Sequence, residues 1–451
     1  MTFLRAIPRS GISSIALATL LSGCAHYMPL SLATAPPLAE TVGELSVAPP
    51  TGGPLSIEQV VTLALANNPD LKAARLKRAV AAGQTKQSGI LPNPSLAGAI
   101  LPLISGAGTV PAWNIGLSQD IKSIITYKSR RRAARDSEQQ VAADVVWQEW
   151  QVAGKARQLA TDLIIGARSR PYYVAAYELL TERNAKLEQA LAARNTTLTI
   201  VAPDRVALQT ARTALNSFDQ NQLSLIHQLN ALLGLRPDVV VPLTAAPDLP
   251  PFDPAAIRAG LATLPDRRPD LLALRLGYAA ADESVRQAIL AQFPDMVLGG
   301  SVASDNSKVI NGGPNVTLGL PIFDHNQGNI AVANATRAQL HAEYEARLAA
   351  TSGEVEAMLS EAEQLAAQLE IARRDLPAAR LAAARASAAF GASNLDERGY
   401  VDLVSNRVSK EQEIMTLELA LLDRQIAIQT LVGAGLPIAD LPPEPVGGAR
   451  P

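Results

Sequence analysis

Asp324 and His325 are neighbours in the stretch GLPIFDHNQGNIAVANA, and an imidazole beside a carboxylate can ligate a metal or move a proton. A closed zinc site needs about four such ligands, and the other histidines are scattered along the chain. The five methionines form no cluster that would bind a soft metal. The sequence therefore predicts a structural turn here, with no metal site and no cofactor.

No catalytic pattern stands out elsewhere. The chain shows neither a nucleophile paired with a base nor a glycine-rich phosphate loop. The remaining candidates are charged side chains where long helical stretches are interrupted, in NTTLTIVAPDRVALQ and in GASNLDERGYVDLVSNR. Taken alone, these charges are either an ordinary solvated helix end with its capping residues or a functional cluster.

The composition favours long helices. The chain has 451 residues, is rich in alanine and leucine, and has only 4% aromatic residues, which suits helices better than an aromatic-rich sandwich. Its formal net charge is −2 and no basic run occurs, so we expect no nucleic-acid partner.

The N-terminus has the pattern of an export signal. Arg5 and Arg9 precede a short apolar stretch, Ile12 to Leu21, which is too short to span a membrane. The stretch ends in LSGC, which resembles the lipobox of bacterial lipoproteins, and Cys24 is the only cysteine. We therefore expect a signal peptide over 1–23 and an N-terminal lipid on Cys24. The alternative is an ordinary signal peptide with an incidental cysteine.

The chain repeats itself at an offset of 200 residues. Pro69–Pro94 and Pro269–Pro294 are identical at ten of 26 positions, where chance would give about one or two. Each half follows the same plan, with a short helix, a helix that ends at a proline, a strand pair, a very long helix and a final helix. That final helix ends in LLGLRP in the first half and in LVGAGLP in the second.

This plan predicts the domain boundaries. We expect glycine-rich turns at Ser105–Gly108 and around Asn311–Pro314, and long helices over about 123–194 and 329–390. The predicted segments are an extended linker over 24–54, a first repeat over 55–250 with a β-hairpin at 95–121, a second repeat over 251–441 with a β-hairpin at 295–321, and a disordered tail over 442–451.

The predicted strands limit the architecture. Strands of about nine residues can cross a membrane when they are tilted, but only helices and closed barrels can span lipid. Four strands cannot close a barrel of this type, whose smallest examples have about eight. The strands therefore form either a small soluble sheet on a helical bundle or one barrel shared by several chains.

The ordered set of motifs resembles the TolC-like outer membrane efflux protein family. It comprises the lipobox, LSIEQVVTLALANNPDLKAAR, GILPNPSL, RRPDLLALRLGYAAADESVRQAILAQFPDMVL and LGLPIFDHNQGNIAVANA, and it covers nearly the whole mature chain. The PIFDHNQGNIA stretch is most similar to the branch that serves resistance-nodulation-division (RND) pumps. The expected fold is mainly α with a small β part: a long α-helical coiled-coil barrel joined to a transmembrane β-barrel that three chains share.

This resemblance implies a passive exit duct and not an enzyme. The implied partners are two further copies of the chain, outer membrane lipid, a periplasmic adaptor and an inner-membrane RND-type transporter. The cargo is left open, because specificity in this family lies in the pump. The rival interpretations are a periplasmic helical adaptor or spacer lipoprotein, and an exported enzyme with a coiled-coil stalk.

The resemblance also implies roles for single residues. An aspartate ring closes the periplasmic tip of such ducts, and Asp402 in YVDL matches its position best. Asp396, Glu397 and Arg398 are candidates for charge pairs that hold this gate shut. Structural junctions between barrel and tunnel are expected at Pro92, Pro94, Pro294, Pro321, Asp324 and Gly328. Pro321 cannot donate to the strand ladder and so ends strand pairing, and Gly328 allows an unusual backbone angle.

Overall fold

The computed structural model describes residues 27–49 and 53–437. The chain divides into two compact units, 1–38 and 39–451, and only the larger one is described in detail below. The described part of the smaller unit contains no helix or strand. The signal peptide 1–23, Cys24 and the tail 442–451 lie outside the described residues.

The larger unit confirms the internal repeat. The first half contains a short 3₁₀ helix η1 (Val42–Glu44), α2 (Ile57–Asn67), α3 (Pro69–Ser88), β1 (Ser95–Leu101), β2 (Ala112–Asp120), α4 (Lys122–Ala192) and α5 (Leu198–Leu233). The second half contains α6 (Pro254–Gly260), η2 (Leu261–Thr263), α7 (Leu264–Arg267), α8 (Pro269–Leu290), β3 (Met296–Ser304), β4 (Ile310–Leu318), α9 (Gln327–Gly391) and α10 (Glu397–Val432).

Local signals set the helix ends. Ser56 forms a reciprocal capping box with Gln59 at the start of α2. Asn68 caps α3, whose first residue is a proline with no N–H to satisfy. At the other end, Gly234 and Gly433 follow α5 and α10 with φ of 77° and 73°, the left-handed conformation that favours glycine. The helix stops predicted at these glycines are confirmed.

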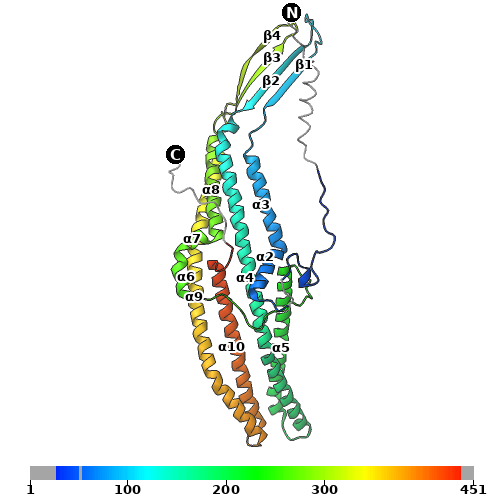
Figure 1. Cartoon of the computed structure of the whole chain (residues 1–451), viewed down its shortest axis with the longest axis vertical. Coiled ribbons are helices and arrows are strands. Elements are labelled where there is room, and N and C mark those ends of the chain that lie inside the picture. Colours follow the sequence, from blue (N-terminus) through cyan, green and yellow to red (C-terminus); the bar gives the residue numbers. More distant parts are fainter. Residues whose placement is uncertain (1–26, 50–52, 438–451) are drawn as a thin grey trace, which may run out of the picture. The chain divides into compact units, whose positions relative to one another are not determined.

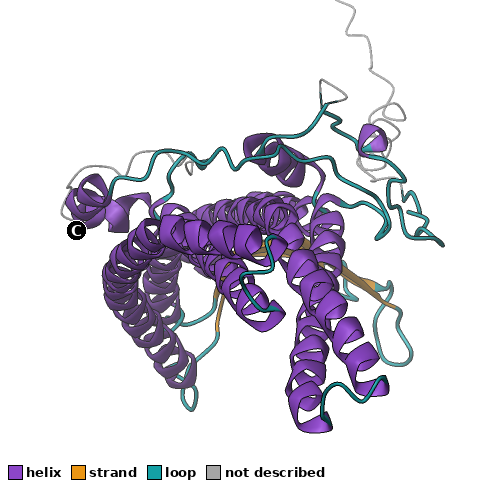
Figure 2. Cartoon of the chain, turned by 90° about the horizontal axis from the view of Figure 1, so that it is seen from below, coloured by secondary structure: helices purple, strands orange, loops and turns teal. Residues whose placement is uncertain are grey.

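The strands and helices of this unit occupy separate zones. Figure 1 shows the four-stranded antiparallel sheet, in the order β1-β2-β3-β4, at one end and the α4–α5 and α9–α10 turns at the other. The long helix α4 contacts α3 and α8 towards the sheet and α5 and α10 towards the opposite end. Seen from the helical end, the long helices lie in a curved layer (Figure 2). No helix in the described ranges is long and apolar enough to cross a membrane.

The main core lies midway along the unit. It joins α2, α4, the end of α5 and the chain that follows α5, with Trp150, Leu159 and Leu229 fully buried. The indole Nε1 of Trp150 donates to the Pro437 carbonyl at 2.5 Å. Arg157 is 1% exposed, lies 3.0 Å from Glu58 and donates to the Ala434 carbonyl, so its buried charge is paired. This core fixes the helices that run to the tip.

The predicted turn at Asn311–Pro314 is wrong. These residues lie inside β4, and the turn lies directly before that strand, at Asp305–Val309. The Asp305 carboxylate accepts from the backbone N–H groups of Ser307 and Val309, and Lys308 takes the left-handed angle (φ 67°). An aspartate can order such a turn through its side chain, while an edge strand tolerates glycine and a proline that lacks an N–H.

Candidate functional site

The strand register divides the sheet into an apolar face and a polar one. Leu96 opposes Leu117, Ile115 opposes Val302, and Leu298 opposes Val316. Because directly opposed residues point to the same side of a sheet, these side chains share one face. All of them are exposed, at 41–74%. The face also carries Ile100, Trp113, Gly300, Gly312, Pro314, Ile310 and Leu318.

The opposite face of the same sheet carries small or polar residues, apart from Leu101 and Val297. Asn114 opposes Ala99 and Ala303, and Ser118 opposes Ser95 and Gly299. The remaining residues of this face include Ala97, Gly116, Ser301, Asn311, Gly313, Asn315 and Thr317. A sheet with one exposed apolar face and one small polar face fits a boundary between hydrocarbon and water.

Aromatic residues lie at both ends of the apolar face. Trp113 opposes Ile100 and Ser304, at the end of the strands far from the helices. At the other end, Phe293 precedes β3 and Phe323 follows β4, and they are 57% and 92% exposed. Aromatic rings flanking an apolar band of strands are typical of membrane–water interfaces.

The junction between sheet and helices is held by short polar contacts. Lys122 Nζ lies 2.7 Å from Asp295 Oδ1, so the start of α4 is tied to the entry of β3. The Pro92 carbonyl accepts from the Gln119 side chain, which fixes the entry to β1. Pro94 directly precedes β1, and Pro294 stands two residues before β3. These prolines therefore lie where the chain passes from the helices to the strands.

The stretch that follows β4 is a turn with an ordered cap. Pro321 lies after β4 ends at Leu318, and the Asp324 carboxylate accepts from the backbone N–H of Asn326. The unusual backbone angle belongs to Asn326 (φ 61°), whereas Gly328 is the second residue of α9, so the prediction that Gly328 takes this angle is wrong. Asparagine tolerates this angle better than most residues, and its Nδ2 donates to the Ala288 carbonyl of α8.

His325 is exposed, and its backbone N–H donates to Gln327. Within the described chain, no three histidine, cysteine or acidic side chains come together as a metal site. Asp324 and His325 are part of the turn between β4 and α9.

Charged side chains tie α4 to its neighbours near the helical tip. Arg183 Nε lies 2.7 Å from Asp204 on α5, and Arg183 Nη1 lies 3.4 Å from Asp402 on α10. The side chains of Arg183 and Asp204 are only 11% and 12% exposed, while Asp402 is 63% exposed. One largely buried guanidinium thus joins three helices.

A second tie lies one turn further along α4. Lys186 Nζ lies 2.9 Å from Glu182 and 3.2 Å from Glu397, and both carboxylates raise the pKa of the lysine. The same ammonium is 5.8 Å from the centre of the Phe390 ring, which stacks on Tyr400 at 4.9 Å. Charge and aromatic packing together hold the α9–α10 turn against α4.

The four predicted gate residues have different surroundings. Asp402 and Glu397 both bridge to α4, but Asp396 caps α10 by accepting from the Gly399 N–H. Arg398 is 78% exposed, and its nearest partner is Asp402 on the same helix, at 3.9 Å. The partners Arg183 and Lys186 were missed. Their spacing of three in TERNAK, just before the first break, puts them on one helix face and was an available signal.

Two carboxyl groups meet inside the helical layer, Asp162 on α4 and Asp423 on α10. Burial and the neighbouring Asp162 carboxylate raise the pKa of Asp423 to about 7, although Lys155 and Arg424 oppose the shift. Burial also raises the pKa of Asp162. Two carboxylates so close cannot both ionise cheaply, so the pair holds a proton near neutral pH.

The family described as "Outer membrane efflux protein" matches residues 261–434 of the chain. The matched segment includes α8, β3, β4, α9 and all of α10, and therefore contains half of the sheet and the whole α9–α10 tip. No curated protein sequence matches the chain significantly.

Solved structures share the fold along most of the chain. The CmeC outer membrane channel of Campylobacter jejuni superposes with a TM-score of 0.69 at 17% identity, over 92% of this chain and 94% of that one. CusC, described in connection with folding and transmembrane channel formation, gives 0.64 at 18% identity, over 90% and 98%. The open MtrE outer membrane channel of Neisseria gonorrhoeae gives 0.61 at 18% identity, over 91% and 98%.

Proposed function

We propose that this chain belongs to the outer membrane efflux protein family and that it forms the exit duct of a tripartite efflux system. The duct passively conducts small molecules or ions that an inner-membrane pump delivers. The strands cross the outer membrane, and the long helices extend into the periplasm. The protein is a channel component and not an enzyme.

The two-faced sheet is the observation that carries this proposal. Its strands of seven to nine residues suit a tilted crossing of the hydrocarbon layer. Leu117 and Val316 lie on the face suited to lipid, and Asn114 and Asn315 lie on the face suited to water. A soluble sheet on a helical bundle would bury its apolar face against helices, whereas this face is exposed.

The free strand edges support a trimer. β1 and β4 are the outer strands of the sheet, and no strand in the described residues pairs with their outer edges. In lipid every backbone N–H and carbonyl needs a partner. Three copies would supply about twelve strands and join each β4 to the β1 of the next chain, which closes the barrel.

The finer assignments follow from this placement. The partners are a periplasmic adaptor and an RND-type inner-membrane transporter, and Cys24, outside the described residues, carries an N-terminal lipid that anchors the chain to the outer membrane. Asp402 forms the narrow ring at the periplasmic tip. The Arg183–Asp402 and Lys186–Glu397 contacts support this gate assignment, because they hold α10 against α4 at that end.

Tag accessibility tests the proposed topology. An epitope inserted after Gly106, in the turn between β1 and β2, is expected to bind antibody on intact cells. Nothing lies within 4 Å of a Cβ placed at that glycine, so the turn has room for an insertion. The same epitope at the α9–α10 turn, after Ser393, is expected to react only after the outer membrane is permeabilised.

A further epitope between Gly312 and Gly313 is the matched control for the strand assignment. Because both residues pair with β3, this insertion is expected to abolish the barrel, whereas the insertion after Gly106 should leave it intact. If the Gly106 epitope reacts only in permeabilised cells, the sheet is periplasmic and the chain is a helical spacer instead of a duct.

A further inference from the structure

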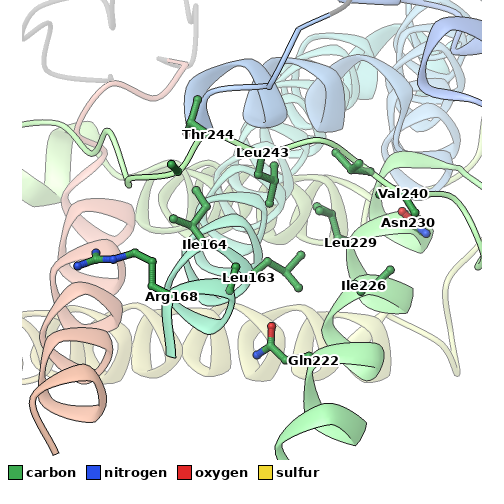
Figure 3. Close-up of a pocket in the computed structure, with 13 residues that line it drawn as sticks. Leu163, Ile164, Arg168, Gln222, Ile226, Leu229, Asn230, Val240, Leu243 and Thr244 are labelled. Atoms are coloured by element: carbon green, nitrogen blue, oxygen red, sulfur yellow. The ribbon is translucent and has the colours of Figure 1, made fainter. Parts of the chain in front are cut away.

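A cavity of about 440 Å³ lies between α4, α5 and the extended chain that follows α5. Figure 3 shows Leu163 and Ile164 of α4, and Ile226 and Leu229 of α5, around one space with Leu243 above it. The lining is mostly apolar, and Val240 at the edge is 83% exposed. The volume falls in the range of about 300–1,000 Å³ that is usual for small-molecule sites.

One buried amide adds a polar group to this apolar lining. Asn230 is fully buried, and its Nδ2 donates to the carbonyls of Pro237 and Val239 at 2.9 and 2.8 Å. A flipped amide would set its oxygen against two carbonyl oxygens, so these bonds fix the orientation. The Oδ1 atom is buried and has no hydrogen-bond partner. An unsatisfied buried acceptor is costly, and a donor that enters the cavity and reaches this atom would satisfy it.

The cavity is formed before any ligand arrives. The extended chain over it is pinned to the segment before α2, because Leu55 N donates to Pro242 O at 2.8 Å and Thr244 N donates to Leu55 O at 3.1 Å. The two Asn230 bonds hold the start of the same chain. A pre-formed cavity loses little conformational entropy on binding.

The charged group beside the cavity is already neutralised. Arg168 points from the cavity towards α10 in Figure 3, and its Nη1 lies 3.1 Å from Glu418 Oε1. The cavity therefore presents no free cation to attract an anionic ligand. Gln222 contributes a second neutral amide at the side opposite Leu243 (Figure 3).

We propose that this cavity is a binding site for a small, uncharged, apolar molecule with one hydrogen-bond donor, which binds to Asn230 Oδ1. The ligand class is that of an aromatic or aliphatic ring system carrying a single N–H or O–H group. The site lies outside the sheet and the helical tip, so the proposal does not depend on the chain acting as a duct.

A pair of isosteric probes tests the role of the donor on the unmodified protein. Fluorine NMR would follow 5-fluoroindole, which has an N–H, and 5-fluorobenzothiophene, which has the same shape without a donor, added to the purified full chain in detergent. The fluoroindole is expected to bind about tenfold more tightly than the fluorobenzothiophene, which is the affinity ratio that one well-formed hydrogen bond provides. Simple partition into micelles would favour the less polar benzothiophene.

Filling the cavity tests the location. Ala167 lines the cavity and is exposed at its rim, so Ala167→Phe should occupy the space without disturbing the core and abolish indole binding. Ala246→Phe is the matched control, because Ala246 is exposed, lies on the same extended chain and does not line the cavity. It should bind indole like the unmodified protein.

Three results would overturn the proposal. The first is absence of indole binding to the unmodified protein, as when a neighbouring chain fills the cavity. The second is equal binding of the two probes, which removes the role of Asn230. The third is unchanged indole binding in Ala167→Phe, which places the probe elsewhere.

Discussion

Arg183 of α4 lies 3.4 Å from Asp402 of α10, although 219 positions separate them in the chain. The same guanidinium contacts Asp204 of α5 at 2.7 Å. Its position between three helices makes Arg183 the main charge tie at the helical tip. Arg398, which the sequence suggested for this role, only approaches Asp402 from within α10.

The first prediction concerns this tie. Arg183→Ala should raise single-channel conductance in planar bilayers, because α10 is then released from α4 and two carboxylates lose their partner. Removing these ion pairs should lower the free energy that holds the tip closed by about 1–2 kcal/mol, between the values for exposed and buried pairs. Arg398→Ala is the control and should change conductance little. A larger increase in Arg398→Ala than in Arg183→Ala would contradict the assignment.

Asp402 itself should determine how the duct responds to cations. Three copies of this carboxylate near one axis would repel one another and attract a divalent ion. Asp402→Ala should therefore leave the trimer intact and weaken block of the channel by divalent cations. The same concentration series on Asp396→Ala serves as control, since Asp396 caps its own helix. Unchanged block in Asp402→Ala would place the constriction elsewhere.

The sheet should tolerate charge on one face only. Leu117→Arg places a charge on the apolar face, at a cost of about 2–4 kcal/mol near the middle of a membrane. Ser118→Arg puts the same side chain on the adjacent residue, which faces the polar side. The amount of heat-resistant trimer in outer membranes should fall sharply for Leu117→Arg and little for Ser118→Arg. Similar losses in both would argue against a lipid-facing sheet.

The Asp162–Asp423 pair should make stability depend on pH. The pKa of Asp423 is raised from 3.8 to about 7, so the folded state holds a proton that the unfolded state releases above pH 4. Stability is therefore lost as pH rises from about 4 to 7. Asp423→Asn should raise the melting temperature of the trimer at pH 8, with a gain on the order of 2 kcal/mol, and should match the unmodified protein near pH 4.

Asp375→Asn is the control for this measurement, because it removes an exposed carboxylate from α9. It should change the melting temperature of the trimer only slightly, and by the same amount at both pH values. A melting difference for Asp423→Asn that is the same at pH 4 and pH 8 would exclude a proton held by the pair.

Lipid attachment at Cys24 remains a prediction from the sequence. Cys24→Ala should abolish incorporation of a labelled fatty acid in cells. The barrel also anchors the chain, so part of the efflux activity should survive. Undiminished label in Cys24→Ala would show that the cysteine is incidental.

Local sequence signals predicted the helices well because helix ends depend on a few neighbouring residues. Gly234 and Gly433 stop α5 and α10 as expected, since their left-handed angles cost other residues more. The turn in the second hairpin was misplaced for the opposite reason. Gly312 and Pro314 look like turn residues, but pairing with β3 keeps them in a strand.

The sequence by itself determined the repeat, the order of helices and strands, and the charged residues available near each helix end, because these follow from local periodicity and short motifs. The tertiary structure decided which of those charges meet. Arg183, Asp204 and Asp402 come together only because α4, α5 and α10 pack side by side. The free acceptor of Asn230 likewise arises only where the chain that follows α5 folds back over the helix and takes both of its amide hydrogens. Contacts between residues far apart in the chain depend on packing of whole elements, and no local pattern encodes them.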